Sequence, residues 1–227
     1  MQIRAVLFDL GGTLVKTADV PQIFSRILET YGIEVSPSEA LKTHKANEKE
    51  FDVDIGQIEL GEAFWSKWNL KILEALGITE KADFLAKKID ELWWNYAEPE
   101  FYPDVMKTLN QLKAMNVKTG IVTNRLRKDF EQILRKLDAT DCFDVIVGID
   151  TCKRAKPDKE IFIYAVEKLQ VKPEATIFIG DSVEKDYEGA RRAGLKPLLI
   201  DRENKSDRNF ETITSLSEVL LRLGKDE

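Results

Sequence analysis

Five short apolar runs recur along the chain, and each ends at a polar residue or a glycine. They cover residues 3–8, 117–122, 144–149, 175–179 and 195–200. Apolar runs of this length, bounded by turn-forming residues, predict buried β-strands. Apolar residues recur every three or four positions in 104–112, 127–137, 158–170, 184–193 and 215–223. This period predicts helices, and strands that alternate with helices predict an α/β sandwich built on a Rossmann-like parallel sheet.

Residues 16–98 interrupt this alternation, because their pattern predicts helices only. The predicted helices span residues 20–31, 37–50, 60–76 and 79–96. All four tryptophans of the chain lie in this block, and we expect them to form the core of a small helical bundle: Trp65, Trp68, Trp93 and Trp94. We therefore predict an α/β core made of residues 1–15 and 99–227, with an inserted helical cap made of residues 16–98.

The composition argues against several classes of protein. The chain has 34 basic and 40 acidic residues and a formal net charge of −6, so nucleic acid is not expected as a partner. The apolar runs are far shorter than the roughly 20 residues of a membrane span, so no membrane partner is expected either. Two cysteines and one histidine are too few for a four-ligand zinc site or a disulfide framework. We expect a cytoplasmic protein with reduced thiols, with His44 on a solvated helix face, and the sequence does not decide between a monomer and a homodimer.

Reactive side chains follow the predicted strands, at the edge where doubly wound sheets bind ligands. They are Asp9 and the Gly11-Gly12 turn after the first strand, Thr123, Asn124 and Arg125 after the second, Lys156 before the helix 158–170, and Asp181 and Asp186 after the strand 175–179. Because parallel strands carry their carboxyl ends at one edge of the sheet, we expect these residues to converge.

Such a set has the composition of a phosphoryl-transfer site. Asp9 and Asp181, with a backbone carbonyl, form an all-oxygen site suited to Mg²⁺. A carboxylate beside this ion and a lysine is able to attack phosphorus and form an aspartyl-phosphate. Lys156 would neutralise the transferring phosphoryl group, and backbone N–H groups of the glycine turn and the Thr123 hydroxyl would hold its oxygens.

Four motifs, in this order, resemble those of the haloacid dehalogenase superfamily of hydrolases. They are Asp9-Leu10-Gly11-Gly12-Thr13, Ile121-Val122-Thr123-Asn124, Lys156-Pro157 and Gly180-Asp181-Ser182-Val183-Glu184-Lys185-Asp186. The helical insertion directly after the first motif is similar to the type-1 cap of that superfamily. The segment Phe101-Tyr102-Pro103-Asp104-Val105 resembles the return from cap to core. The resemblance covers essentially the whole chain.

The resemblance implies a role for each motif residue. Asp9 would be the nucleophile and a Mg²⁺ ligand, together with Asp181 and the backbone carbonyl of Gly11. Thr123 and Gly12 would bind phosphoryl oxygens, and Lys156 would stabilise the pentacoordinate state. Asp186 would orient Lys156 or a metal-bound water, and Asn124 would contact the phosphate or the leaving group.

Position 11 departs from the family pattern. The phosphatases of the family carry a second aspartate there, which protonates the leaving group and then activates water, whereas this chain has Gly11. General acid–base catalysis contributes typically about 10²–10⁴-fold. We therefore predict a slow or selective Mg²⁺-dependent hydrolase of a small phosphate monoester, acting through an aspartyl-phosphate on Asp9, in which a cap residue supplies the acid or the leaving group is a good one.

Other functions stay open on the same fold. The 2-haloacid dehalogenases of the family also lack that aspartate, usually have tyrosine in its place, and bind halide with a cap arginine. Arg26 is the only arginine within residues 16–98. Phosphonate cleavage would need a cap lysine as a Schiff base, and none of the cap lysines is distinguished. A non-catalytic protein would bind a phosphorylated ligand in the same pocket.

Overall fold

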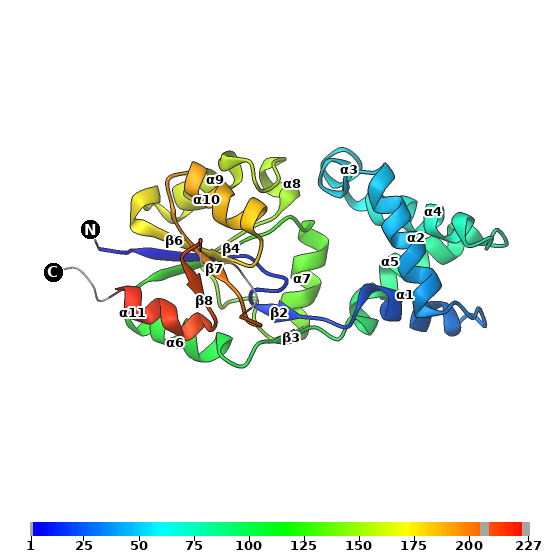
Figure 1. Ribbon diagram of the computed structural model, residues 1–227, viewed down its shortest axis with the longest axis horizontal. Coiled ribbons are helices and arrows are strands. Elements are labelled where there is room, and N and C mark those ends of the chain that lie inside the picture. Colours follow the sequence, from blue (N-terminus) through cyan, green and yellow to red (C-terminus); the bar gives the residue numbers. More distant parts are fainter. Residues whose placement is uncertain (1, 205–208, 224–227) are drawn as a thin grey trace.

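A six-stranded sheet forms the centre of the computed structural model, which describes residues 2–204 and 209–223 (Figure 1). Its strands are β1 (Ala5–Phe8), β4 (Lys118–Val122), β5 (Val145–Val147), β6 (Thr176–Gly180), β7 (Lys196–Ile200) and β8 (Thr212–Ile213). They lie in the order β5-β4-β1-β6-β7-β8, and every pair is parallel. The five predicted strands are therefore present, each within two residues of its expected limits, and the two-residue strand β8 is an addition.

Helices cover both faces of this sheet. They are α6 (Val105–Ala114), α7 (Arg127–Lys136), α8 (Ile149–Cys152), α9 (Lys159–Leu169), α10 (Gly189–Arg192) and α11 (Leu220–Leu223). Alternate residues of β1 point to opposite faces: Val6 and Phe8 pack with α6 and α7, whereas Ala5 and Leu7 pack with α9 and α10. This is the predicted α/β sandwich.

Five helices are inserted between two short strands that pair antiparallel, β2 (Val15–Lys16) and β3 (Glu100–Phe101). These helices are α1 (Val20–Glu29), α2 (Pro37–Glu50), α3 (Val53–Leu60), α4 (Phe64–Ala75) and α5 (Ala82–Tyr96). Figure 1 shows them grouped at one end of the molecule, beyond α7 and opposite the two termini. Helix α2 begins at Pro37 as expected, because Ser36 and Glu39 form a capping box: the Ser36 hydroxyl accepts from the Glu39 N–H, and the Glu39 carboxylate accepts from the Ser36 N–H.

The inserted block differs from expectation at α3. The sequence predicts one helix over 60–76, but α4 begins at Phe64 after a 3₁₀ turn (Gly61–Ala63), and the separate helix α3 precedes it. The Asp52 carboxylate caps α3 by accepting from the backbone N–H groups of Asp54 and Ile55, both at 3.0 Å.

His44 is buried, so the expectation of a solvated position is wrong. Its residue exposure is 6%. Ala40, His44 and Asn47 share one face of α2, and this face packs against α1 and α4. The imidazole meets the Phe24 ring edge-on, with the ring centroids 5.1 Å apart. Burial lowers the pKa of His44 to about 4, and its Nε2 has no hydrogen-bond partner among the described residues.

No helix within residues 2–204 and 209–223 is both long enough and apolar enough to cross a bilayer.

Candidate active site

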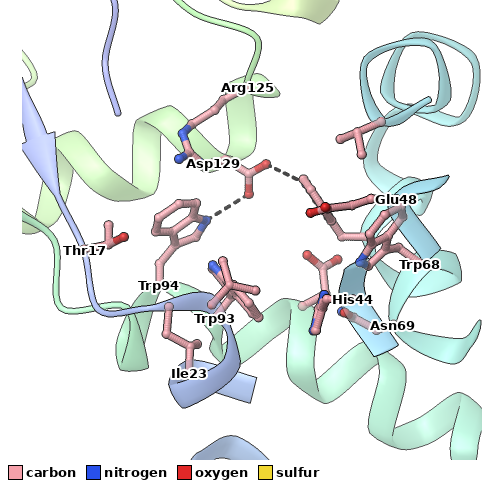
Figure 2. Close-up of a pocket in the computed structure, with 14 residues that line it drawn as sticks. Thr17, Ile23, His44, Glu48, Trp68, Asn69, Trp93, Trp94, Arg125 and Asp129 are labelled. Carbon is pink, nitrogen blue, oxygen red and sulfur yellow. Dashed lines mark hydrogen bonds between the residues drawn. The ribbon is translucent and has the colours of Figure 1, made fainter. Parts of the chain in front are cut away.

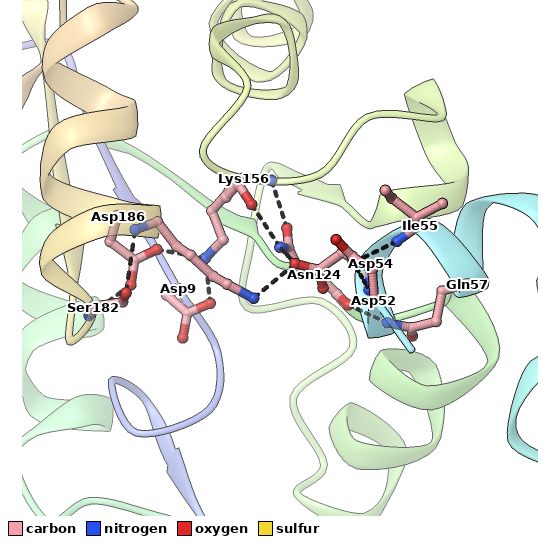
Figure 3. Close-up of polar contacts among 10 residues, drawn as sticks. Asp9, Asp52, Asp54, Ile55, Gln57, Asn124, Lys156, Ser182 and Asp186 are labelled. Carbon is pink, nitrogen blue, oxygen red and sulfur yellow. Dashed lines mark hydrogen bonds and ion pairs between the residues drawn. The ribbon is translucent and has the colours of Figure 1, made fainter. Parts of the chain in front are cut away.

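One buried lysine links two carboxylates at the carboxyl edge of the sheet. The Lys156 Nζ lies 2.5 Å from Asp9 Oδ1 and 2.6 Å from Asp186 Oδ1 (Figure 3). Asp9 directly follows β1, Lys156 precedes α9, and Asp186 lies in a π-helical segment, Val183–Glu188, after β6. Lys156 and Asp186 are each only 2% exposed, so the three charges interact away from bulk water.

The charges of this cluster depend on each other. Burial opposes the charged form of Lys156, but the Asp9 and Asp186 carboxylates outweigh it and raise the pKa of Lys156. The lysine therefore stays an ammonium group. Burial also raises the pKa of Asp9, while the nearby ammonium acts in the opposite direction. The Asp9 carboxyl thus depends on positive charge beside it to ionise.

Asp181 completes a group of three carboxylates. One oxygen each from Asp9, Asp181 and Asp186 lie within 4.8 Å of one another. The pKa of Asp181 is raised to about 6, first by partial desolvation and then by the negative charges of Asp9 and Asp186. Asp181 as a whole residue is nevertheless exposed. Carboxylate oxygens crowded in this way are the ligands that Mg²⁺ takes, and the residues present fit that ion.

The glycine turn after Asp9 makes room for this group. Gly12 has φ +79°, and a Cβ at this position would stand 2.3 Å from Asp181 Oδ2. The Gly12 N–H donates to the Val15 carbonyl at 2.9 Å, so in this structure it closes the turn. Gly11 is joined to Val15 by an isolated bridge.

Thr123 and Asn124 follow β4 as expected. Thr123 is buried, and its N–H donates to the Val147 carbonyl at 2.9 Å. The Asn124 amide is engaged in three hydrogen bonds. Its Oδ1 accepts from the Lys156 N–H at 2.7 Å, and its Nδ2 donates to the Lys156 carbonyl and to Asp54 Oδ2, both at 2.9 Å. Asn124 therefore fixes the backbone of the lysine.

Helix α3 reaches this edge from the inserted block, which the sequence analysis missed (Figure 3). Asp54 Oδ2 also accepts from Lys185 Nζ at 2.7 Å, and Gln57 Nε2 donates to the Asn124 carbonyl at 3.2 Å. The only sequence signal for α3 was Asp52 as a capping residue, because eight residues are too few to establish a helical period.

A cavity of about 200 Å³ lies between the inserted helices and α7 (Figure 2). All four tryptophans line it, with His44, Arg125 and Asp129 among the polar residues. The indole N–H groups of Trp65 and Trp94 donate to the two oxygens of Asp129, at 3.1 and 2.9 Å. The tryptophans thus join the inserted helices to α7 as well as packing within the bundle.

Comparisons with known proteins identify the family of this chain. The model of the haloacid dehalogenase-like hydrolase family matches residues 3–194. The glyceraldehyde 3-phosphate phosphatase of Methanopyrus kandleri is 31% identical over 211 residues, which is 90% of this chain and 87% of that protein. The pyrophosphatase PpaX of Bacillus cereus is 35% identical over 203 residues, which is 88% of this chain and 84% of that protein.

A solved structure extends the agreement to the whole chain. The crystal structure of a HAD phosphatase from Thermococcus onnurineus matches with a TM-score of 0.68 and 26% identity, over 98% of both chains. The family model and the relatives identify a hydrolase, and the parallel sheet covered by helices gives it an α/β fold. The chain belongs to the haloacid dehalogenase-like hydrolase family.

Proposed function

We propose that this protein is a Mg²⁺-dependent phosphatase that hydrolyses a small phosphorylated metabolite through an aspartyl-phosphate on Asp9. The observation that carries the proposal is the contact of Lys156 Nζ with both Asp9 and Asp186, beside the third carboxylate of Asp181. The names of the relatives, a glyceraldehyde 3-phosphate phosphatase and a pyrophosphatase, support a small phosphorylated substrate.

Each residue of the cluster has a part in this proposal. The Asp9 carboxylate attacks phosphorus, and the Lys156 ammonium neutralises negative charge on the phosphoryl oxygens. The Thr123 hydroxyl, at the end of β4, holds one of those oxygens. Asp186 keeps the ammonium in place, and Asn124 does the same for the lysine backbone.

A bound Mg²⁺ would be held by Asp9, Asp181 and the Gly11 carbonyl, with Asp186 alongside, and would supply positive charge for the phosphoryl oxygens and for the ionised form of Asp9. The fit rests on the all-oxygen set of carboxylates within 4.8 Å and on the raised pKa of Asp181, since a cation relieves the repulsion that raises it.

We further propose that residues 16–98 are a cap domain over a core made of residues 1–15 and 99–227. Its support is the set of polar contacts between α3 and the active-site edge, where Asp54 bonds to Asn124 and Lys185. A cap in this position excludes water from the reaction and selects the substrate.

The test is phosphate release from a panel of sugar, nucleotide and acyl phosphates, with and without Mg²⁺. We expect Mg²⁺-dependent release that Asp9→Asn abolishes. Chloride release from 2-chloropropionate without added metal would instead identify a dehalogenase. Against that alternative, Arg26 is exposed and pairs with Glu98 at 2.8 Å. Binding of phosphorylated compounds without turnover would identify a non-catalytic protein.

A further inference from the structure

The guanidinium of Arg125 stands where the family's phosphatases have an acid. A Cβ on Gly11 would lie 3.1 Å from Arg125 Nη2, so any side chain at position 11 would meet this group. Arg125 follows β4 two residues after Thr123 and is half-buried. The site thus carries a permanent positive charge beside the nucleophile's turn, in place of a carboxyl group able to give and take a proton.

This guanidinium is held in place without a hydrogen-bond partner among the described residues. Burial raises the pKa of the neighbouring Asp129, and the positive charge of Arg125 acts to lower it. Its Cζ lies 5.1 Å from the centroid of the Trp94 ring, and Figure 2 shows it beside Asp129. Both oxygens of Asp129 are already taken by the indoles of Trp65 and Trp94. Across residues 2–204 and 209–223 the Arg125 side chain makes no hydrogen bond and no ion pair. A guanidinium that is held against an aromatic ring and keeps its N–H donors free of protein acceptors is suited to an oxyanion ligand.

We propose that Arg125 binds the leaving group as an anion, and that the substrates are phosphoric anhydrides, in which phosphorus is bonded to a phosphate or carboxylate leaving group. The proposal rests on the proposed phosphatase function. An alkyl ester leaves as a strongly basic alkoxide and needs a proton, which Gly11 does not supply. A phosphate or carboxylate leaves without one, and a guanidinium pairs with its oxygens.

The chemistry balances without a general acid. An Asp9 oxygen bonds to phosphorus, the bond from phosphorus to the leaving oxygen breaks, and the electron pair stays on that oxygen beside Arg125. For acetyl phosphate the leaving group is acetate, and no proton moves in this step. Water then bonds to phosphorus as the bond to Asp9 breaks, and both of its protons remain on the dihydrogen phosphate that is released. Asp9 is again a carboxylate.

The location of Arg125 between two spaces fits this role. It lines the cavity of about 200 Å³ that the tryptophans enclose, and it also lines a second hollow that Gly11 and Gly12 border. Arg125 thus lies both at the glycine turn that follows Asp9 and at the cavity beneath the inserted helices.

The experiment compares kcat/KM for four probes with Mg²⁺ present: pyrophosphate, acetyl phosphate, glycerol 3-phosphate and p-nitrophenyl phosphate. In the unaltered protein we expect the two anhydrides to exceed glycerol 3-phosphate by about 10²-fold or more, the size of the missing general acid. In Arg125→Gln we expect kcat/KM for the two anhydrides to fall by about 10- to 100-fold, because charge-assisted hydrogen bonds to the leaving group are lost. We expect kcat/KM for p-nitrophenyl phosphate to fall by less than about 3-fold. Arg127→Gln is the matched control, because Arg127 is exposed and its guanidinium lies at 4.0 Å from Glu131.

Three results would overturn the proposal. The first is a kcat/KM for glycerol 3-phosphate that equals those for the anhydrides. The second is an equal loss of kcat/KM for all four probes in Arg125→Gln. In both cases the phosphatase function itself survives. The third is no Mg²⁺-dependent turnover of any probe, which removes the proposed function together with the inference. If Arg125→Gln does not fold, Arg125→Lys takes its place, because lysine keeps the positive charge but lacks the planar set of N–H donors. We expect Arg125→Lys to lose part of the preference for anhydrides.

Discussion

Gly12 and Asp181 lie so close together that any side chain at position 12 would displace the Asp181 carboxylate, since a Cβ there would stand 2.3 Å from Asp181 Oδ2. Gly12 therefore leaves the space that the Asp181 carboxylate occupies, although the two residues are far apart in the sequence. The carboxylate group that would hold Mg²⁺ depends on this contact.

Gly12→Ala should weaken Mg²⁺ binding by displacing Asp181. We expect a loss of affinity of about 10- to 100-fold, as is typical when a group that supports a metal ligand is changed. Isothermal titration with Mg²⁺ measures it. Gly194→Ala is a matched control, because Gly194 has φ +81° but its Cβ would meet nothing closer than 3.6 Å. Both variants should lose about 1–2 kcal/mol of stability from backbone strain, and equal Mg²⁺ affinity in the two would contradict the role of Gly12.

Gly11→Asp should add the missing general acid. We expect turnover of glycerol 3-phosphate to rise much more than that of p-nitrophenyl phosphate, whose leaving group needs no proton. The new side chain would meet Arg125 Nη2, which is the movable end of a side chain, so the variant should fold.

Arg125 limits this gain, because an ion pair would hold the new carboxyl ionised. The double variant Gly11→Asp with Arg125→Gln should therefore show the larger increase for the alkyl ester. Equal increases for both esters, in variants that fold and bind Mg²⁺, would contradict the missing-acid explanation.

His44 should make the protein less stable below neutral pH. Its folded pKa of about 4 lies below the ordinary 6.5, so the unfolded chain takes up the proton first as the pH falls. The contribution is complete above pH 6.5 and is lost between 6.5 and 4. Between pH 7 and 5 it amounts to about 2 kcal/mol of the free energy of unfolding.

Urea unfolding of the unaltered protein and of His44→Phe isolates this effect. His44 is the only histidine of the chain, so carboxylates that titrate in the same range are common to both proteins and cancel. We expect the difference in free energy of unfolding between the two to shift by about 2 kcal/mol from pH 7 to pH 5. A difference that is constant with pH would mean that the pKa of His44 is the same in the folded and the unfolded protein, and would contradict the lowered value.

The sequence was sufficient for the sheet and for the carboxylate cluster. Buried strands such as β1 and β6 are continuous apolar runs, and a parallel sheet brings the residues after them to one edge. Asp9 and Asp181 are therefore placed by topology alone. The lysine belongs with them because Lys156 precedes a helix that packs on the same sheet.

The contacts between the inserted helices and the core could not be predicted from the sequence. The eight residues of α3 carry no clear period, so Asp54 and its bonds to Asn124 and Lys185 were not foreseen. The residues around His44 in α2 are mostly polar, so their pattern did not indicate that His44 faces α4. The position of Arg125 depends on two distant segments, one ending at Gly11 and the other containing Trp94, whose approach only the folded chain defines.

The most direct test of the account is to look for the phosphoryl group on Asp9. The protein is mixed with acetyl phosphate and Mg²⁺, quenched in acid during turnover, digested and analysed by mass spectrometry. We predict one added phosphoryl group on the peptide that contains Asp9, and none in Asp9→Asn. Rapid phosphate release, with that peptide unmodified at every time of quenching and with Asp9→Asn still active, would contradict it.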